Sequence, residues 1–175
     1  LDCPGSVDFV AESVAILPAV DLVVVVAVAD EKKIPALQVI LRTLEERKIP
    51  RLLFLNKMDK ADARVRSTLE MLQPASSVPL VLRHIPIWQS GVVTGFIDLA
   101  LERAFVYREH AASETIDMGD EGRAREAEAR FSMLETLADY DDGLMEQLLE
   151  DIQPDRDSVF RDLVQELREG LICPV

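Results

Sequence analysis

The sequence contains few of the residues that mark secreted, membrane-bound or metal-binding proteins. There are two cysteines, Cys3 and Cys173, which form neither a disulfide framework nor a metal-ligand cluster and therefore fit a reducing cytosol. No run of 18 or more apolar residues is uninterrupted, so we expect no membrane-spanning helix. The first residues do not resemble a signal peptide, since Asp2 and Asp8 stand where a basic region would be. We therefore expect a cytoplasmic protein.

Glycine is scarce as well. The seven glycines are Gly5, Gly91, Gly95, Gly119, Gly122, Gly143 and Gly170. None of them opens a Gly-x-x-x-x-Gly-Lys-Ser/Thr segment, whose backbone amides and lysine hold the phosphates of a nucleotide. A phosphate-binding loop of this kind is therefore excluded within residues 1–175.

The net charge of −13 lies entirely in the later part of the sequence. Residues 1–108 contain 13 acidic and 13 basic side chains, whereas residues 109–175 contain 19 acidic and 6 basic ones, a difference of −13. Because such a surface repels phosphate backbones, we expect no direct nucleic acid binding by these acidic helices. Two interpretations stay open: a solvated helix surface, or a docking face for a basic protein.

The apolar pattern of the first 74 residues predicts alternating helices and strands. The runs 21–28 and 51–55 lack polar alternation and are typical of strands buried on both faces of a parallel sheet. Apolar residues at helical spacing predict helices at 7–17, 35–44 and 61–72, the first of which Pro18 ends. This order predicts parallel pairing with right-handed crossovers and ligand binding at the carboxyl ends of the strands.

After Pro74 the pattern predicts a small antiparallel sheet followed by acidic helices. A turn is predicted at Gln89-Ser90-Gly91, and Pro79 and Pro86 favour an edge position for the strand that precedes it. The predicted elements are strands at 78–87, 92–99 and 103–107, a loop at 109–121, helices at 123–138, 143–151 and 158–169, and a returning strand at 171–175. We therefore expect an α/β protein in three parts, residues 1–74, 75–170 and 171–175.

The segment Asn56-Lys57-Met58-Asp59 directly follows the second predicted parallel strand. A carboxylate at Asp59 can accept hydrogen bonds from both the ring N–H and the exocyclic amine of guanine, paired donors that adenine lacks. Asn56 would hold neighbouring loops together, and the stem of Lys57 would lie along the face of the base. The alternative is a polar strand end followed by a helix N-cap at Asp59.

The segment Leu1-Asp2-Cys3-Pro4-Gly5-Ser6-Val7-Asp8-Phe9 contains a second pattern, Asp-x-x-Gly before a helix. In phosphate-binding α/β folds such an aspartate holds Mg²⁺ through water. The glycine lets its backbone N–H approach a terminal phosphate because no side chain stands in the way.

Together the two motifs, in this order, resemble the G domain of the elongation factor G family. That family carries Asp-Thr-Pro-Gly-His-Val-Asp-Phe at the first place and Asn-Lys-Met-Asp at the second. The stretches Gly95–Leu99 and Ala104–Tyr107 are similar to the insert that the family places after its guanine motif. The resemblance covers nearly the whole chain.

The resemblance implies a partial GTPase-type parallel sheet, without its first strands and phosphate loop, plus an inserted subdomain. In the parent protein Asp2 and Gly5 would serve Mg²⁺ and the terminal phosphate, while Asn56, Lys57 and Asp59 would hold the base of GTP or GDP. The parent would act on the ribosome in protein synthesis, with ribosomal proteins among its partners. We expect the chain alone to hold about half a nucleotide site, to bind no nucleotide tightly and to be inactive.

Two departures from the family pattern put catalysis in doubt. Ser6 stands where the family has the histidine that positions the attacking water, and Cys3 replaces its threonine. A competing interpretation is therefore a non-enzymatic protein-interaction module with relic nucleotide motifs. A third, a cysteine-dependent enzyme built on Cys3, rests only on the helix N-terminus that follows this residue.

Other residues give weaker signals. Trp88 is interpreted as a packing residue or an exposed contact, and His84 and His110 as structural or surface groups. In the implied topology, strand 21–28 has an unpaired apolar edge, and such edges recruit other strands. We therefore expect a symmetric dimer through this edge, or its covering by a rearranged terminus.

Overall fold

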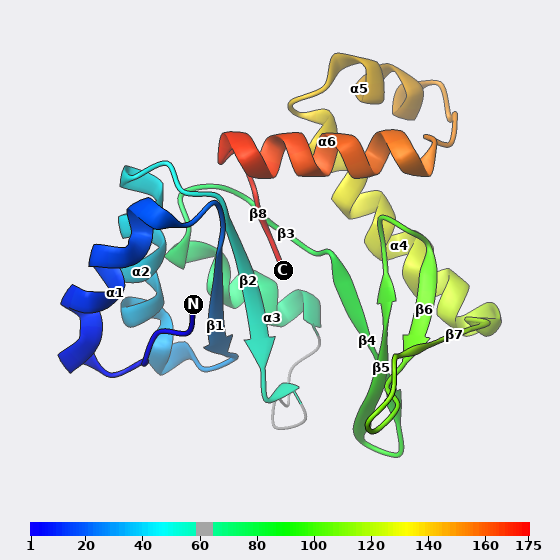
Figure 1. The fold of residues 1–175 in the computed structure, drawn as a ribbon. Coiled ribbons are helices and arrows are strands. Elements are labelled where there is room, and N and C mark those ends of the chain that lie inside the picture. The colour runs from blue at the N-terminus through cyan, green and yellow to red at the C-terminus, as the bar shows by residue number, and fades with distance from the viewer. Residues whose placement is uncertain (59–64) are drawn as a thin grey trace.

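The computed structural model describes residues 1–58 and 65–175, which form a parallel part and an antiparallel part (Figure 1). In the parallel part β1 (Val23–Val28) and β2 (Arg51–Asn56) pair from Val23 opposite Arg51 to Val28 opposite Asn56. α2 (Ile34–Glu46) connects them, with a proline in its first turn as expected. The predicted strand–helix–strand unit is confirmed.

The parallel strands are covered on one face only. Val25 and Leu53 pack against Leu41 and its neighbours on α2. On the opposite face Val24 is 52% exposed and Val26 62% exposed. The prediction of burial on both faces is therefore wrong, because the described helices cover one side of the strand pair.

Shorter helices flank this strand pair. The first predicted helix is α1 (Val10–Ile16), which has a single-turn helix at each end, η1 (Val7–Phe9) and η2 (Leu17–Ala19), and no buried residue. The predicted helix 61–72 is described from Val65 as α3 (Val65–Leu72), and its first predicted residues lie outside the described part. The 3-10 turn η5 (Gln73–Ala75) follows it.

The antiparallel part is a four-stranded sheet in the order β4-β5-β6-β7. Its strands are β4 (His84–Gln89), β5 (Val92–Asp98), β6 (Arg103–Val106) and β7 (Glu114–Ile116). Ser90 and Gly91 join the first two strands with φ values of 51° and 79°, which suit the twist of a tight hairpin. β4 is an edge strand, as its proline predicts.

Two strand predictions are wrong. The run 78–87 is not one strand: β3 (Leu80–Val81) pairs in parallel with β8 (Cys173–Pro174), and β4 begins separately at His84. An apolar run alone does not tell which partner its backbone bonds, and here Cys173 N donates to Pro79 O. The predicted loop 109–121 contains β7, whose three residues are too few to show alternation.

Three helices complete the antiparallel part, and each begins earlier than predicted. They are α4 (Gly119–Ala138), α5 (Asp142–Leu149) and α6 (Arg156–Glu169). The Asp155 side chain caps α6 by accepting from two backbone N–H groups, and Gly170 ends it with a φ of 75°. The predicted returning strand is confirmed as β8. None of the described helices is long and apolar enough to cross a membrane.

Each part has its own cluster of buried side chains. In the antiparallel part the cluster joins the inner face of the sheet to α4, α5 and α6, and Leu137 at its centre is fully buried. In the parallel part the cluster joins one face of β1 and β2 to α2, α3 and Cys173 of β8. The returning strand therefore packs between the two parts.

Candidate functional site

The carboxyl ends of β1 and β2 lie side by side (Figure 1). The parallel register places Val28, the last residue of β1, opposite Asn56, the last residue of β2. Asp30 follows β1, and its carboxylate accepts a hydrogen bond of 3.0 Å from the backbone N–H of Lys32. Because ligands of parallel sheets bind beyond the carboxyl ends of the strands, this edge is the candidate site.

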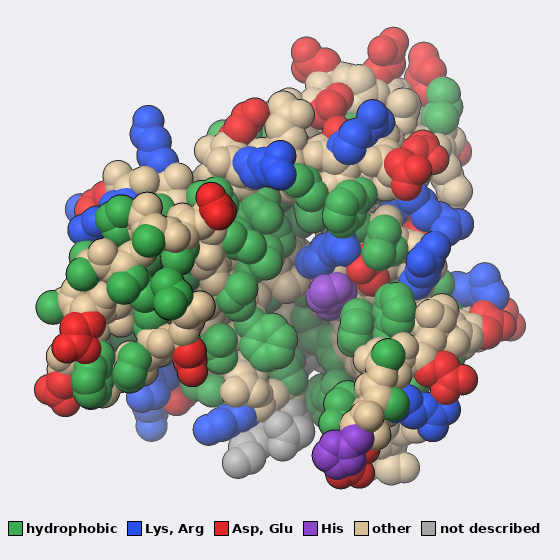
Figure 2. Space-filling model, in the orientation of Figure 1, with side chains coloured by type: hydrophobic (Ala, Val, Ile, Leu, Met, Phe, Trp, Pro, Cys, Tyr) green, Lys and Arg blue, Asp and Glu red, His purple; other side chains and the backbone are tan. Residues whose placement is uncertain are grey.

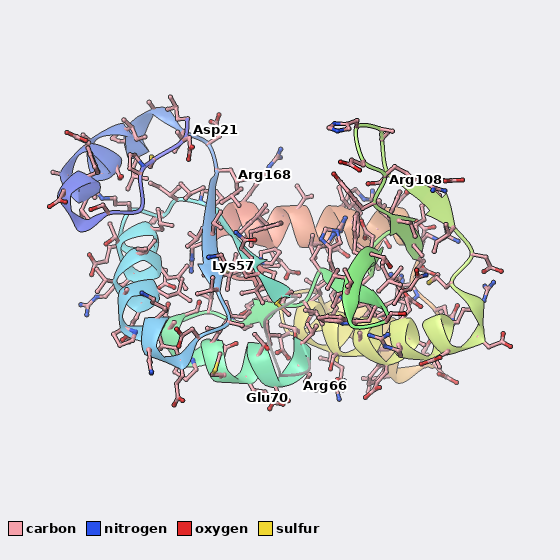
Figure 3. The ribbon with its side chains drawn as sticks, turned by 90° about the horizontal axis from the view of Figure 1, so that it is seen from below. Asp21, Lys57, Arg66, Glu70, Arg108 and Arg168 are labelled. Atoms are coloured by element: carbon pink, nitrogen blue, oxygen red, sulfur yellow. The ribbon has the colours of Figure 1, made fainter. Side chains whose placement is uncertain are left out.

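Asn56 and Lys57 are exposed at this edge. Asn56 Oδ1 accepts a hydrogen bond of 2.8 Å from the backbone N–H of Lys57. Lys57 has a φ of 58°, a left-handed conformation that costs a non-glycine residue about 1–3 kcal/mol. Figure 3 shows Lys57 where β1 and β2 end. Asp59, the predicted base-reading residue, lies outside the described residues.

The left-handed backbone at Lys57 is a feature that the sequence analysis missed. Such strained conformations concentrate at functional sites, because the surrounding structure must hold them in place. A lysine at a strand end gives no sequence signal for it, whereas a glycine or asparagine would.

The N-terminal segment with Asp2 and Gly5 is exposed and precedes η1. In Figure 1 it lies on the α1 side of β1. Within the described part of the chain, no hydrogen bond or ion pair joins Asp2 or Gly5 to Asn56 or Lys57. The described residues of the two motifs thus lie in the same part of the fold, with no hydrogen bond or ion pair between them.

Gly5 is not required by packing. A Cβ added at this position would meet no atom within 4 Å, and its φ is not positive. Gly95 is the opposite case, because a Cβ there would lie 2.0 Å from the backbone oxygen of Phe105. The fold therefore explains the glycine at position 95 and leaves the one at position 5 to another cause.

Ser6 is engaged locally. Its Oγ donates to Asp8 Oδ2 at 3.0 Å and accepts from the backbone N–H of Asp8 at 3.4 Å. Its carbonyl accepts from the backbone N–H of Phe9 at 3.0 Å. These contacts are those of a residue that begins a helix.

The Asp-x-x-Gly segment offers one exposed carboxylate, that of Asp2, to a magnesium ion. Among these residues no group of three or more histidine, cysteine, aspartate or glutamate side chains is arranged to hold a metal ion. Mg²⁺ commonly keeps several waters and binds through one or two carboxylates together with phosphate oxygens. Asp2, exposed before a helix, can serve as such a carboxylate.

The other residues considered in the sequence analysis are the two cysteines, the two histidines and Trp88. Cys3 is exposed, while Cys173 is buried and burial raises the pKa of its thiol to about 11. His84 Nε2 lies 3.5 Å from Asp98 Oδ2, and the exposed His110 Nε2 lies 3.6 Å from Glu109 Oε1. Trp88 is half-buried and lines a groove of about 870 Å³ between α3 and α4.

Comparisons with known proteins agree with these features. Residues 1–158 match the family described as the elongation factor Tu GTP binding domain. The chain is 38% identical over 175 residues to an elongation factor G-like protein of Synechocystis, covering 100% of this chain and 26% of that protein. A crystal structure of a protein from Thermus thermophilus superposes with a TM-score of 0.79 at 27% identity, again over 100% of this chain and 26% of the other.

The chain thus spans about a quarter of the length of these relatives. Its parallel strand pair, its antiparallel sheet and the order of its motifs agree with the predicted fold class. The match of residues 1–158 extends from the Asp-x-x-Gly segment through the Asn-Lys-x-Asp segment and into the start of α6. The chain therefore belongs to the family of the elongation factor Tu GTP binding domain.

Proposed function

We propose that this chain is part of the nucleotide-binding domain of an elongation factor G-like GTPase. The longer protein binds GTP or GDP with Mg²⁺, acts on the ribosome during protein synthesis and works in the cytoplasm. The observation that carries the proposal is the position of Asn56 at the end of β2, beside the end of β1, in a chain of the elongation factor Tu GTP-binding family.

Each motif residue has one role in this proposal. Asp2 holds Mg²⁺ through water, and the backbone N–H of Gly5 approaches the terminal phosphate. Asn56 and Lys57 support the base, and Asp59 accepts from its two N–H donors. The open space around Gly5 supports its role, because packing gives no other reason for a glycine there. Bound Mg²⁺ neutralises phosphate charge and orients the phosphates.

The chain also divides into functional parts in this proposal. Residues 1–74 and 171–175 belong to the nucleotide-binding domain, and residues 75–170 form its inserted subdomain. The chain by itself carries only part of the nucleotide site, so we expect it to be inactive alone. The acidic helices face proteins and not nucleic acid, because their charge opposes phosphate.

Base specificity tests the proposal. The protein, extended at both ends, is titrated with fluorescent GDP and with fluorescent xanthosine diphosphate. The titrations are repeated with the Asp59→Asn variant. An asparagine amide donates where the carboxylate accepted, so it suits the carbonyl that xanthine carries in place of the guanine amine. We expect tight GDP binding that falls at least about 100-fold in the variant, with xanthine nucleotide binding gained.

A second candidate is a protein-interaction module in which the nucleotide motifs are relics. The local hydrogen bonds of Ser6 favour it, since they engage this side chain at the start of a helix. Absence of GDP binding by the extended protein, with its fold intact by circular dichroism, would support this candidate and contradict the first. GDP binding that Asp59→Asn leaves unchanged would contradict the assigned role of Asp59.

A further inference from the structure

The face of the antiparallel sheet that points away from α4 carries a row of aromatic side chains. The register places Phe96 of β5 opposite Phe105 of β6, and Phe105 opposite Thr115 of β7. The two phenylalanine rings are stacked, with centroids 5.2 Å apart and planes inclined by 23°. Tyr107 follows two residues after Phe105, so it points to the same face. We call the surface formed by His84, Phe96, Arg103, Phe105, Tyr107 and Thr115 the open face.

The aromatic side chains of the open face are accessible. Tyr107 is 68% exposed, Phe96 and Phe105 are half-buried, and Thr115 is exposed. The other face of the same strands is covered, since Ile85, Ile97 and Ala104 belong to the core cluster with α4. Figure 2 shows apolar side chains and a histidine gathered on the open face of this sheet. The half-buried rings of Phe96 and Phe105 are not part of the core cluster, which points to a role in contact.

A neighbouring row of the same face contains one cationic group, Arg103, and one ring with N–H donors, His84. The register places His84 opposite Asp98 and Asp98 opposite Arg103. The ring of His84 also meets the edge of Phe96, with centroids 4.8 Å apart. Arg103 is exposed, and the side chain of His84 is 46% exposed. The row that contains Arg103 thus lies beside the row of stacked rings.

The one carboxylate within these rows is already neutralised. Asp98 is 4% exposed, and its Oδ2 lies 2.7 Å from a guanidinium nitrogen of Arg83. Its Oδ1 accepts from the backbone N–H groups of Ala100 and Leu101. Burial raises the pKa of Asp98, but the hydrogen bonds from His84 and Leu101 and the charge of Arg83 outweigh it and leave the pKa lowered. Asp98 therefore stays ionised and paired, so the positive charge exposed on this face comes from Arg103.

We propose that the open face binds single-stranded RNA. A base extends the Phe96–Phe105 stack on the side of Thr115, a second base packs on Tyr107, and the backbone phosphates lie near Arg103 and His84. Sheets that present stacking rings beside cationic groups suit single strands, because bases there are free to leave their own stack. This function goes beyond nucleotide binding at the end of β2 and does not rest on it.

The net charge limits the strength of this interaction. The chain carries −13, and its acidic excess lies on α4, α5, α6 and their flanks, whose field opposes an approaching polyanion. Binding therefore depends on stacking more than on charge, and salt weakens it less than it would weaken a basic patch. The acidic helices themselves remain a surface that excludes nucleic acid.

Fluorescence anisotropy of a short labelled oligouridine with the full 175-residue chain tests the proposal. Phe105→Leu and Tyr107→Leu keep apolar volume and remove one ring each, and each is expected to weaken binding about tenfold. Arg103→Gln is expected to lower the slope of log affinity against log salt by about one. Phe131→Leu, an exposed phenylalanine of α4, and Arg42→Gln, an exposed arginine of α2, are the matched controls.

Thermal unfolding of each variant separates lost binding from lost folding. The proposal is overturned if oligouridine does not bind below about 1 mM at low salt. It is equally overturned if the ring variants bind as the controls do, or if duplex RNA of matched length binds as tightly as the single strand. If oligouridine does not bind, the rings of Phe96, Phe105 and Tyr107 would instead be candidates for contact with a protein.

Discussion

The two sheets of this chain differ in how they bury their apolar side chains. The antiparallel sheet packs one face on α4 and leaves the other to solvent, which such sheets tolerate. The parallel pair also packs one face, on α2, yet its other face carries Val24, Val26 and Phe54 at 52%, 62% and 57% exposure. A parallel pair is normally covered on both faces. The antiparallel sheet thus leaves uncovered a face of the kind that such sheets tolerate. The parallel pair leaves three large apolar side chains uncovered by the described residues.

The helices repeat this difference. α4 buries six residues, including Met133 and Leu137, whereas α1 buries none. A helix gains most of its stability from the apolar face that it packs. We therefore expect α1 to open more readily than α4, and the antiparallel part to contribute most of the stability.

The largest effect is expected in the core of the antiparallel part. Leu137→Ala removes a fully buried side chain and should lower the free energy of unfolding by about 2–5 kcal/mol. Val26→Ala truncates a side chain on the uncovered face of β1 and should change it by less than about 0.5 kcal/mol. Urea titrations of both variants measure the contrast. Equal losses would mean that the face of β1 is covered after all.

A second contrast concerns two glycines. Gly95→Ala places a methyl group against the backbone of Phe105 and should destabilise the chain by about 1–3 kcal/mol. Gly5→Ala meets open space and should leave the melting temperature within about 1 °C, given how little such surface changes cost. Differential scanning fluorimetry is sufficient. If Gly5→Ala destabilised the fold, packing would explain this glycine and the nucleotide role would lose its support.

The third prediction concerns pH and the buried carboxyl group of Glu166 on α6. Burial, together with the charges of Asp162, Asp141 and Glu169, raises its pKa from 4.5 to about 8. Between pH 4.5 and about 8 the carboxyl group of Glu166 is ionised in the unfolded chain but still protonated in the folded chain. The free energy of unfolding therefore falls as the pH rises through this range. The raised pKa of Tyr140, which burial and nearby Asp139 and Glu166 cause, belongs to the same acidic environment.

Glu166→Gln should remove this loss. At pH 8 we expect the variant to be more stable by on the order of 1 kcal/mol, about 2–4 °C in Tm for a chain of this size. At pH 4.5 the two proteins should melt together. Glu150→Gln, an exposed carboxylate just after α5, is the control and should leave the pH profile unchanged. If the stability of the unsubstituted chain does not change between about pH 5 and 8, the raised pKa assigned to Glu166 is wrong.

The smallest effect on stability concerns the edge of β1. Within the described residues β1 pairs with β2 alone, which agrees with the predicted unpaired edge. We predict self-association of the chain through this edge. Val24→Lys, on the exposed face of β1, should favour the monomer in sedimentation equilibrium while barely changing the Tm. If the unsubstituted chain stays monomeric at all concentrations, this prediction is wrong.

Much of the fold follows from local sequence signals. The β-branched run of β1, the proline of α2, the aspartate before α6 and the glycine after it each specify a local conformation. β3 and β7 were mispredicted for a different reason. They are two and three residues long, and their pairing with β8 and β6 is decided by tertiary contacts.

The candidate site was predictable in outline from its motif letters. Asn56 lies at the strand end that the motif predicts, and Asp2 and Gly5 precede the predicted helix. The left-handed backbone of Lys57 was not predictable, because no glycine or asparagine marks it. The aromatic rows of the open face also escaped notice, since they depend on a register across three strands and not on spacing along one.

The different surroundings of the two cysteines have a practical consequence. A maleimide added to the native protein reaches the exposed sulfur of Cys3, whereas Cys173 is packed away and protonated. A dye is thus delivered to one place, beside the Asp-x-x-Gly segment, without mutagenesis. The much slower second modification, followed by mass spectrometry, then reports how often β8 detaches from its neighbours.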